Sequence, residues 1–172
     1  DNYSWALKNV AALTVDSNGN LWFGSKQGIG KNVNGKWQLF TGKEEVPYTN
    51  FTCASPGLNG EVWFGTEIGA IRVENDYFYY RNTRRWLPNN SVNDIAVSAD
   101  GTAWIATDNG ISQIIAKEMT YDEKATYFTQ QVEERHNRMG FICQSALLEQ
   151  FDITTSQLAI SDNDGLYTAM YG

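Results

Sequence analysis

The sequence predicts a mainly β fold made of repeated antiparallel sheets, followed by a helical segment at the C-terminus. Three observations lead to this prediction. Trp22, Trp63 and Trp104 follow one another at intervals of 41 residues, and each lies in a copy of one short motif. The glycines that bound the motif repeat at the same interval. After Ile115 the motif ends, and no Gly or Pro follows until Gly140. A period of this length indicates a modular array in which each unit packs against the next.

Each repeat carries the signals of short β-strands separated by tight turns. The first strand, such as 9–15, alternates small and apolar residues and ends in a turn rich in Asn, Asp and Gly. The second strand carries the Trp, and a glycine turn leads to a third. An aromatic outer strand follows at 36–40 and 76–81. Four strands in about 41 residues match the size of a propeller blade.

We therefore expect a partial β-propeller of three four-stranded blades over residues 1–116. The repeats span about 9–49, 50–90 and 91–116. Three blades do not close a ring, because propellers typically contain four to eight. The expected partners are the remaining blades, supplied either by the rest of a larger protein or by another copy of the chain. An unclosed array would expose apolar faces at its ends.

The repeated pattern V-x-x-[IL]-x-x-[DS]-x-x-G-x-[LVA]-W-[FI]-[GA]-[TS]-x-x-G-[IA] resembles the repeat of the two-component regulator propellers. The resemblance covers roughly residues 9–117. It implies a ligand-sensing or carbohydrate-associated scaffold of the kind found in the sensor regions of bacterial hybrid kinases and in secreted or surface proteins. It assigns no activity to any single residue.

Residues 117–172 read as a helical segment and the start of a second domain. Apolar residues fall near helical spacing over about 117–138, and Gly140 is the expected C-cap. The stretches RHNRMGF and DNDGLYTAMY resemble the entry to a helical toroid domain that follows such propellers in some secreted proteins. The chain is thus expected to be part of a larger protein.

Charge and composition exclude some classes of function. The chain has 172 residues, with 20 acidic and 13 basic side chains and a net charge of -7. A nucleic-acid partner is not expected, because phosphate binding needs a basic face. No run of 18 apolar residues occurs, so we expect no membrane span.

Glycosylation sequons favour an extracellular or secreted protein. They place candidate glycans on Asn2, Asn50 and Asn89. Cys53 and Cys143 are the only cysteines, so one internal disulfide at most can form. A buried free thiol at Cys53 is the alternative.

His136 is the only histidine, and it lies between Arg135 and Arg138. One interpretation is a catalytic proton carrier, or an anion contact in which the arginines bind a sugar carboxylate or sulfate. The alternative is a polar helix end that caps carbonyl groups and pairs with Glu133 or Glu134.

Asp162, Asn163 and Asp164 form a cluster of oxygen-bearing side chains before Gly165. As candidate catalytic residues, Asp162 and Asp164 would serve as acid and base on a glycoside, with Asn163 contacting the ligand. A second interpretation is Ca²⁺ binding, although a complete EF-hand loop is absent. The third is an Asx turn that caps a helix starting near Gly165. No other metal site or cofactor is predicted.

The aromatic residues have two interpretations. The three repeat Trp residues are either core residues between blades or a platform that stacks on sugar rings. The four aromatics of 77–80 cannot all face inward from one strand, and so are available to cover a neighbouring domain or chain.

No complete catalytic constellation appears in the sequence. We therefore expect a non-catalytic binding or scaffold part of a larger secreted β-propeller protein, associated with carbohydrate. One alternative is a fragment of a carbohydrate-active enzyme, a polysaccharide hydrolase or lyase, whose site lies at the junction between propeller and helical domain. Another is an oligomeric propeller lectin.

Overall fold

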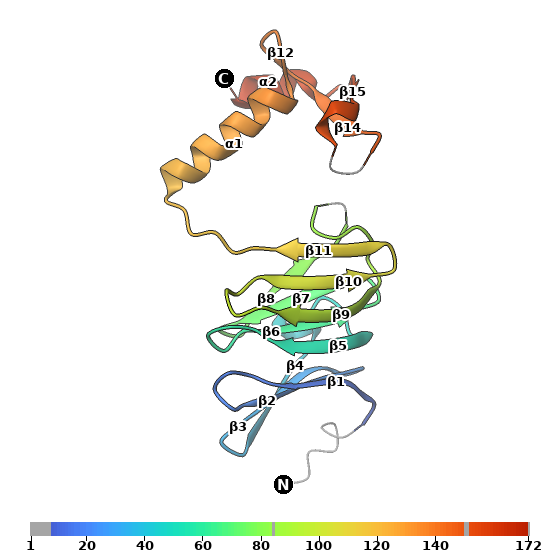
Figure 1. The fold of residues 1–172 in the computed structure, drawn as a ribbon, viewed down its shortest axis with the longest axis vertical. Coiled ribbons are helices and arrows are strands. Elements are labelled where there is room, and N and C mark those ends of the chain that lie inside the picture. Colours follow the sequence, from blue (N-terminus) through green and yellow to red (C-terminus); the bar gives the residue numbers. More distant parts are fainter. Residues whose placement is uncertain (1–7, 84, 150–151, 172) are drawn as a thin grey trace. The chain divides into compact units, whose positions relative to one another are not determined.

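The computed structural model describes residues 8–83, 85–149 and 152–171. The chain divides into two compact units between Ala116 and Lys117, and each is described here by itself. The first unit contains three antiparallel sheets (Figure 1). Blade 1 comprises β1 (Val10–Val15), β2 (Leu21–Ser25), β3 (Gly28–Val33) and β4 (Lys36–Phe40). Blade 2 comprises β5 (Phe51–Pro56), β6 (Val62–Thr66), β7 (Gly69–Glu74) and β8 (Tyr77–Arg81), and blade 3 comprises β9 (Val92–Val97), β10 (Ala103–Thr107) and β11 (Gly110–Ile114).

The three blades lie face to face in chain order (Figure 1). Within each blade the strands pair in sequence order, so every connection is a hairpin. The first strands β1, β5 and β9 are neighbours from blade to blade. A 3₁₀ turn, η1 (Gly42–Glu44), lies in the connection from blade 1 to blade 2. The predicted mainly β, partial-propeller architecture is confirmed.

Blade 3 has three described strands where four were expected. The positions one repeat after β8 are 118–122, and there a helix begins instead of a strand. Thr120 is its N-cap: the Thr120 hydroxyl accepts a hydrogen bond from the Glu123 N–H, and the Glu123 carboxylate accepts one from the Thr120 N–H. This reciprocal capping box commits the segment to helix α1 (Tyr121–Arg135). The same residues therefore cannot extend the sheet.

A hydroxyl–carbonyl hydrogen bond explains the S/T-x-x-G part of the repeat. The hydroxyl donates to the carbonyl three residues on in every blade, over 3.3 Å from Ser25 to Gly28, 2.6 Å from Thr66 to Gly69 and 2.9 Å from Thr107 to Gly110. In blade 2 the glycine has a φ of 143°, and a Cβ there would lie 2.6 Å from the carbonyl oxygen of Arg81. Only glycine fits this turn without strain.

One apolar core lies at each junction between blades. At the junction of blades 1 and 2, Trp22 and Phe40 pack with Phe51, Phe64 and Ile71. At the junction of blades 2 and 3 the core residues are Trp63, Ala70, Leu87, Val92, Ile95, Ala103 and Ile105. Each buried repeat Trp is thus covered by the blade that follows it, which supports the core interpretation for Trp22 and Trp63.

The outer strand β8 alternates as a strand should. Phe78 and Tyr80 pack against the core between blades 1 and 2, whereas Tyr77 and Tyr79 are 67% and 39% exposed. Only alternate members of this aromatic run are therefore available to other groups.

The indole N–H of Trp22 is satisfied by a buried carboxylate. Trp22 Nε1 donates to Asp16 Oδ2 over 2.8 Å. Asp16 Oδ1 accepts from the backbone N–H groups of Asn18 and Asn20, both at 2.9 Å. Burial alone would raise the pKa of Asp16, but the hydrogen bonds from Trp22, Asn20 and Asn18 outweigh it and hold the pKa below its ordinary value of 3.8.

The second unit mixes helices with short hairpins. After α1 come β12 (Asn137–Arg138), β13 (Phe141–Ile142), β14 (Gln144–Leu147), the 3₁₀ turn η2 (Ile153–Thr155), β15 (Ser156–Ala159) and α2 (Asp164–Tyr171). The strands pair as β12 with β13 and β14 with β15. The sequence predicted a helical segment here, whereas the structure contains short strands as well as helices.

The end of the first helix differs from the prediction over 117–138. Helix α1 ends at Arg135 with His136 as its C-cap, so Gly140 does not cap it. Instead, Met139 and Gly140 form the turn of the β12–β13 hairpin with φ angles of 55° and 89°. Asn137 Oδ1 accepts a hydrogen bond from the Gly140 N–H over 2.8 Å and fixes this turn. Two successive residues with positive φ are typical of a type I′ hairpin.

We expect Asp16→Asn to lower the free energy of unfolding by about 1–3 kcal/mol at pH 7, because the indole N–H of Trp22 then loses a charged acceptor in a buried place. The folded-state pKa of Asp16 is lowered, so its stabilisation is present above the ordinary value of 3.8 and is lost as the pH falls through the folded-state value. Urea unfolding of both proteins between pH 7 and pH 3 measures this. The difference should shrink on acidification.

Asp108→Asn, in an exposed turn of blade 3, is the matched control and should change little. Equal stability of the Asp16 variant and the unmodified protein at pH 7 would contradict the role given to Asp16.

Candidate functional site

The last blade leaves uncovered the residues that are core elsewhere in the array. Trp22 and Trp63 are 5% and 3% exposed, whereas Trp104 is 44% exposed. Ile29 and Ala70 are fully buried, and their equivalent Ile111 is 71% exposed. We refer to Trp104 and Ile111 as the blade 3 end face.

The first blade shows the same effect on its opposite side. Val10 is 42% exposed, and its equivalents Phe51 and Val92 are buried. Leu13 is 61% exposed, while Ile95 at the same repeat position is buried. Val10, Leu13 and the half-exposed Val15 form the blade 1 end face. Both ends of the array therefore present apolar surface of the kind that the inner junctions bury.

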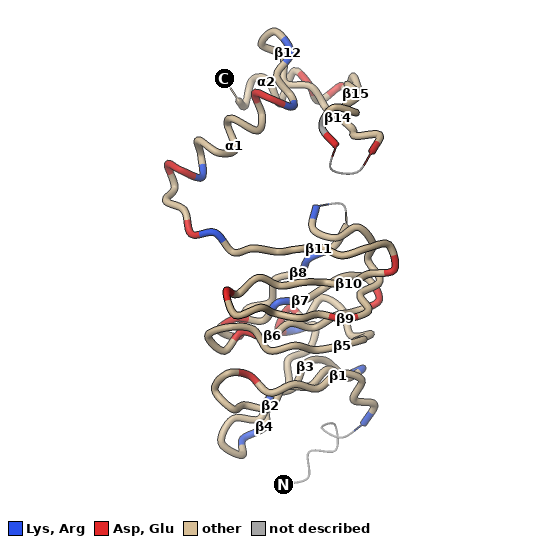
Figure 2. Tube along the Cα trace, viewed as in Figure 1, with Lys and Arg blue, Asp and Glu red and all other residues tan. Residues whose placement is uncertain are grey.

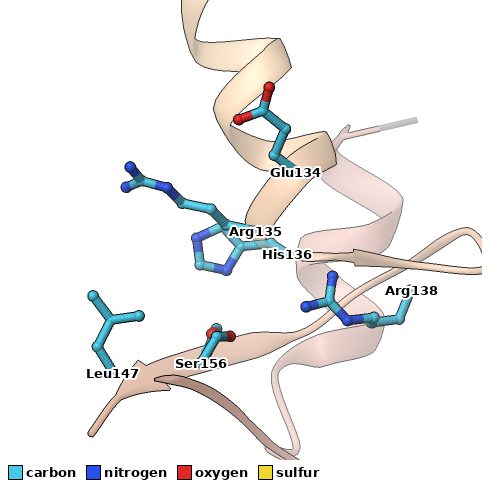
Figure 3. Close-up of a pocket in the computed structure, with 7 residues that line it drawn as sticks. Glu134, Arg135, His136, Arg138, Leu147 and Ser156 are labelled. Atoms are coloured by element: carbon cyan, nitrogen blue, oxygen red, sulfur yellow. The ribbon is translucent and has the colours of Figure 1, made fainter. Parts of the chain in front are cut away.

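A hollow of about 220 Å³ lies in the second unit and gathers the predicted cationic residues. Arg135 and His136 come from the end of α1, and Arg138 comes from β12. Ser145 and Ser156 line the opposite side from β14 and β15, and their hydroxyl oxygens lie 2.6 Å apart. Figure 3 shows the imidazole of His136 between the side chains of Arg135 and Arg138.

The tautomer of His136 is set by its backbone partner. Nδ1 lies 3.1 Å from the carbonyl oxygen of Cys143, so Nδ1 carries the proton and donates. In the neutral ring this leaves Nε2 as an acceptor. Within the described residues no carboxylate hydrogen-bonds to this imidazole. The hollow thus offers two guanidinium groups, one imidazole, two hydroxyls and one carboxylate, that of Glu134. The two guanidinium groups outnumber the carboxylate, and such a set suits an anionic oxygen group.

The acidic cluster lies apart from this hollow: Asp162, Asn163 and Asp164 are not among its lining residues. Asp164 begins α2, and its two oxygens accept hydrogen bonds from the N–H and hydroxyl of Ser161, both over 3.1 Å. These bonds lower the pKa of Asp164, chiefly through the Ser161 N–H. Asp162 and Asn163 are exposed. The arrangement is that of a helix cap.

No group of three or more His, Cys, Asp or Glu side chains suited to a metal ion occurs in the part of the chain that the structure describes. The two oxygens of Asp164 are already engaged by Ser161.

The candidate glycosylation sites differ in their surroundings. Asn2 lies outside the described residues. Asn50 is exposed, and its side-chain nitrogen donates to Glu67 over 2.8 Å and to Tyr48 over 3.1 Å. Asn89 is half-buried, and its side-chain oxygen accepts from the Ser91 N–H. Both cysteines are free thiols, and burial raises the pKa of Cys53.

Charge is spread rather than concentrated. Figure 2 shows that the acidic residues of the first unit lie mainly at the turns between strands, with Lys and Arg interspersed. Among the described residues, no helix is long and apolar enough to cross a membrane.

Part of the hollow was not predicted from the sequence. Ser145, Leu147 and Ser156 reach it only because β14 pairs with β15, which places Ser145 opposite Leu158 and Leu147 opposite Ser156. Neither strand shows the regular alternation of apolar and polar residues from which a hairpin can be predicted.

The repeats match the model of a known protein family. The family model described as "Two component regulator propeller" matches residues 4–27 and 87–109. No curated protein matches the chain in sequence.

Solved structures resemble part of the chain. BT3049 of B. thetaiotaomicron, described as the extracellular domain of a hybrid two-component system, is 25% identical with a TM-score of 0.50. The match covers 62% of this chain and 15% of that one. The extracellular domain of BT4673 from the same organism is 20% identical with a TM-score of 0.51, over 64% of this chain and 16% of that one.

An inactive variant of virginiamycin B lyase from Staphylococcus aureus, solved with quinupristin, is 21% identical with a TM-score of 0.50. This match covers 64% of this chain and 39% of that one. The lyase and BT4673 share the fold alone with this chain. The chain spans well under half the length of each of these proteins. Its first unit is a partial β-propeller, and its repeats at residues 4–27 and 87–109 are similar to those of the two-component regulator propellers.

Proposed function

We propose that the first unit is a non-catalytic scaffold or binding part of a larger extracellular β-propeller protein. The observation that carries the proposal is the pair of apolar end faces. Each consists of side chains whose repeat equivalents are buried by an adjoining blade. The occupants that fit are therefore further blades of the same kind, supplied by the rest of the protein. The extracellular assignment of BT3049 supports the proposed location.

A second proposal concerns the hollow of the second unit and the expected carbohydrate partner. Arg135, His136 and Arg138 together with two serine hydroxyls would suit the carboxylate or sulfate of an acidic sugar. This supports binding more than catalysis, because the hydrogen bonds of Asp164 engage it in capping α2. A catalytic pair of His136 with Asp164 would require a rearrangement of this cap, and Asp162 is not among the residues that line the hollow.

We expect the 172-residue chain to self-associate through its end faces. Trp104→Gln with Ile111→Ser should reduce self-association in sedimentation velocity and reduce binding of the apolar dye ANS, because both side chains are exposed. The double variant should lower the free energy of unfolding by less than about 1 kcal/mol. Trp63→Gln, at the same repeat position, should cost about 3 kcal/mol because Trp63 is buried.

A discrete dimer whose formation needs both end faces would favour a six-bladed ring of two copies over completion by other blades. A chain that stays monomeric and binds no ANS would contradict the proposal.

For the hollow, we expect binding to acidic glycans on an array and none to their neutral counterparts. Arg135→Gln with Arg138→Gln should weaken this binding at least about tenfold, because each charge-assisted hydrogen bond contributes about 1.5–3 kcal/mol. Lys124→Gln, on an exposed part of α1 away from the lining residues, is the control and should leave binding unchanged.

The same array probed with EDTA tests the calcium alternative. Binding that persists supports the hollow, whereas binding that requires calcium would point to the cluster at 162–164. Equal binding of acidic and neutral glycans would refute the assignment.

A further inference from the structure

The repeat places an arginine in blade 2 where blade 1 has a core aromatic. Phe40 and Arg81 are 41 residues apart, and they pair with the equivalent residues Ile29 and Ala70 of the neighbouring strand. Phe40 is 4% exposed and packs against Phe78 of the next blade, with ring centroids 5.4 Å apart. A guanidinium at such a position loses much of its hydration, so it is unfavourable unless other groups pair with it or accept its hydrogen bonds.

Arg81 is only partly satisfied by its own protein. Its Nη1 donates to the carbonyl of Tyr80 over 3.2 Å. Its Nε is buried and has no hydrogen-bond partner among the described residues. The guanidinium carbon lies 4.5 Å from the ring centre of Trp86 and 5.8 Å from that of Tyr79. These aromatic contacts favour the cation but accept no hydrogen bond from Nε.

The neighbouring Arg72 gives a contrast on the same face of blade 2. Its guanidinium pairs with Glu61 over 2.7 Å and with Glu74 over 2.8 Å. No ion pair of Arg81 occurs in the described part of the chain. Burial, followed by the charges of Arg72 and Arg85, lowers the pKa of Arg81, although a guanidinium stays protonated at neutral pH. An unneutralised cation therefore remains at this junction.

A cavity of about 120 Å³ lies at this arginine, lined by Glu61, Trp63, Arg72, Trp86 and Ile114 as well as Arg81 itself. Its origin follows from the fold. In the junction of blades 1 and 2, an outer-strand aromatic, Phe78, fills the space against Phe40. Blade 3 has no fourth strand beside β11 in the described structure, so the corresponding filler is missing.

We propose that this cavity binds the carboxylate group of a small organic acid, with Arg81 as the anchoring residue. The two terminal nitrogens of an arginine form a planar fork that matches a carboxylate in a two-pronged contact. The cavity is the size of a small group, and Trp63, Trp86 and Ile114 offer apolar surface to the rest of the ligand. Glu61 is already engaged by Arg72 and by the indole N–H of Trp63, so it does not compensate the Arg81 charge.

The proposal does not depend on the end faces or on the hollow of the second unit. Its ligand has two sources, a free small acid or the uronic acid of a sugar. The 172-residue chain carries Arg135→Gln and Arg138→Gln throughout, so that the hollow of the second unit adds no anion binding, and is titrated by calorimetry with acetate, glucuronate, sulfate and glucose. We expect acetate and glucuronate to bind with a Kd of about 1 mM or below, glucose not to bind, and sulfate to bind more weakly. Tighter binding of glucuronate than of acetate identifies the sugar acid as the source, and equal binding identifies the free acid.

Three substitutions at one position test the anchor. Arg81→Phe restores the residue of blade 1, and should abolish carboxylate binding while raising Tm. Arg81→Gln should weaken binding at least about tenfold. Arg81→Lys keeps the charge without the fork, and should weaken acetate more than sulfate. Circular dichroism verifies the fold of each variant, and Lys36→Gln, exposed at the start of β4, controls for net charge.

The proposal is overturned if neither carboxylate binds at about 50 mM, a concentration well above the expected Kd. It is equally overturned if folded Arg81→Phe and Arg81→Lys bind acetate as the unmodified chain does.

Discussion

The structure depends on one constraint: the apolar face of each blade is stable only when another blade covers it. Trp63 is 3% exposed under blade 3, and Trp104 is 44% exposed where no described blade follows. The two residues occupy the same repeat position, so the difference comes from the neighbour and not from the blade itself. Covering the indole also requires an acceptor for its N–H, which Asp16 supplies to Trp22 and Glu61 supplies to Trp63. The acceptor therefore comes from a different repeat position in each of these two blades.

The same constraint leaves room for function. Because hairpin pairing and the hydroxyl–glycine turn define a blade, the outer-strand side chains are free to differ between blades. Phe40 closes one junction with an aromatic contact, while Arg81 leaves a charge and a cavity at the next. A ligand site can therefore arise at one junction without disturbing the repeat that builds the others.

Most of the propeller could be predicted from the sequence, because its signals are local. Trp spacing, turn glycines and period-two alternation each report on a few adjacent residues. The missing fourth strand of blade 3 escaped prediction although Thr120 and Glu123 have the spacing of a capping box. The helix was predicted to begin at about residue 117, which places Thr120 and Glu123 in its interior and not at its N-terminal cap. The hollow of the second unit was half predicted: Arg135 and Arg138 are neighbours in sequence, but Ser145 and Ser156 meet only through tertiary pairing.

The second unit shows how local capping limits what its polar residues can do. None of the described side chains of α1 or α2 is buried, so within the described residues no packed core holds these helices. Their ends are fixed instead by side-chain caps, Glu123 with Thr120 and Asp164 with Ser161. A carboxylate that stabilises a helix start is engaged by its donors and held at a lowered pKa, the opposite of what a general acid needs. No ion pair of Arg135 or Arg138 with a carboxylate occurs in the described residues, and for this reason we propose binding rather than acid catalysis for this unit.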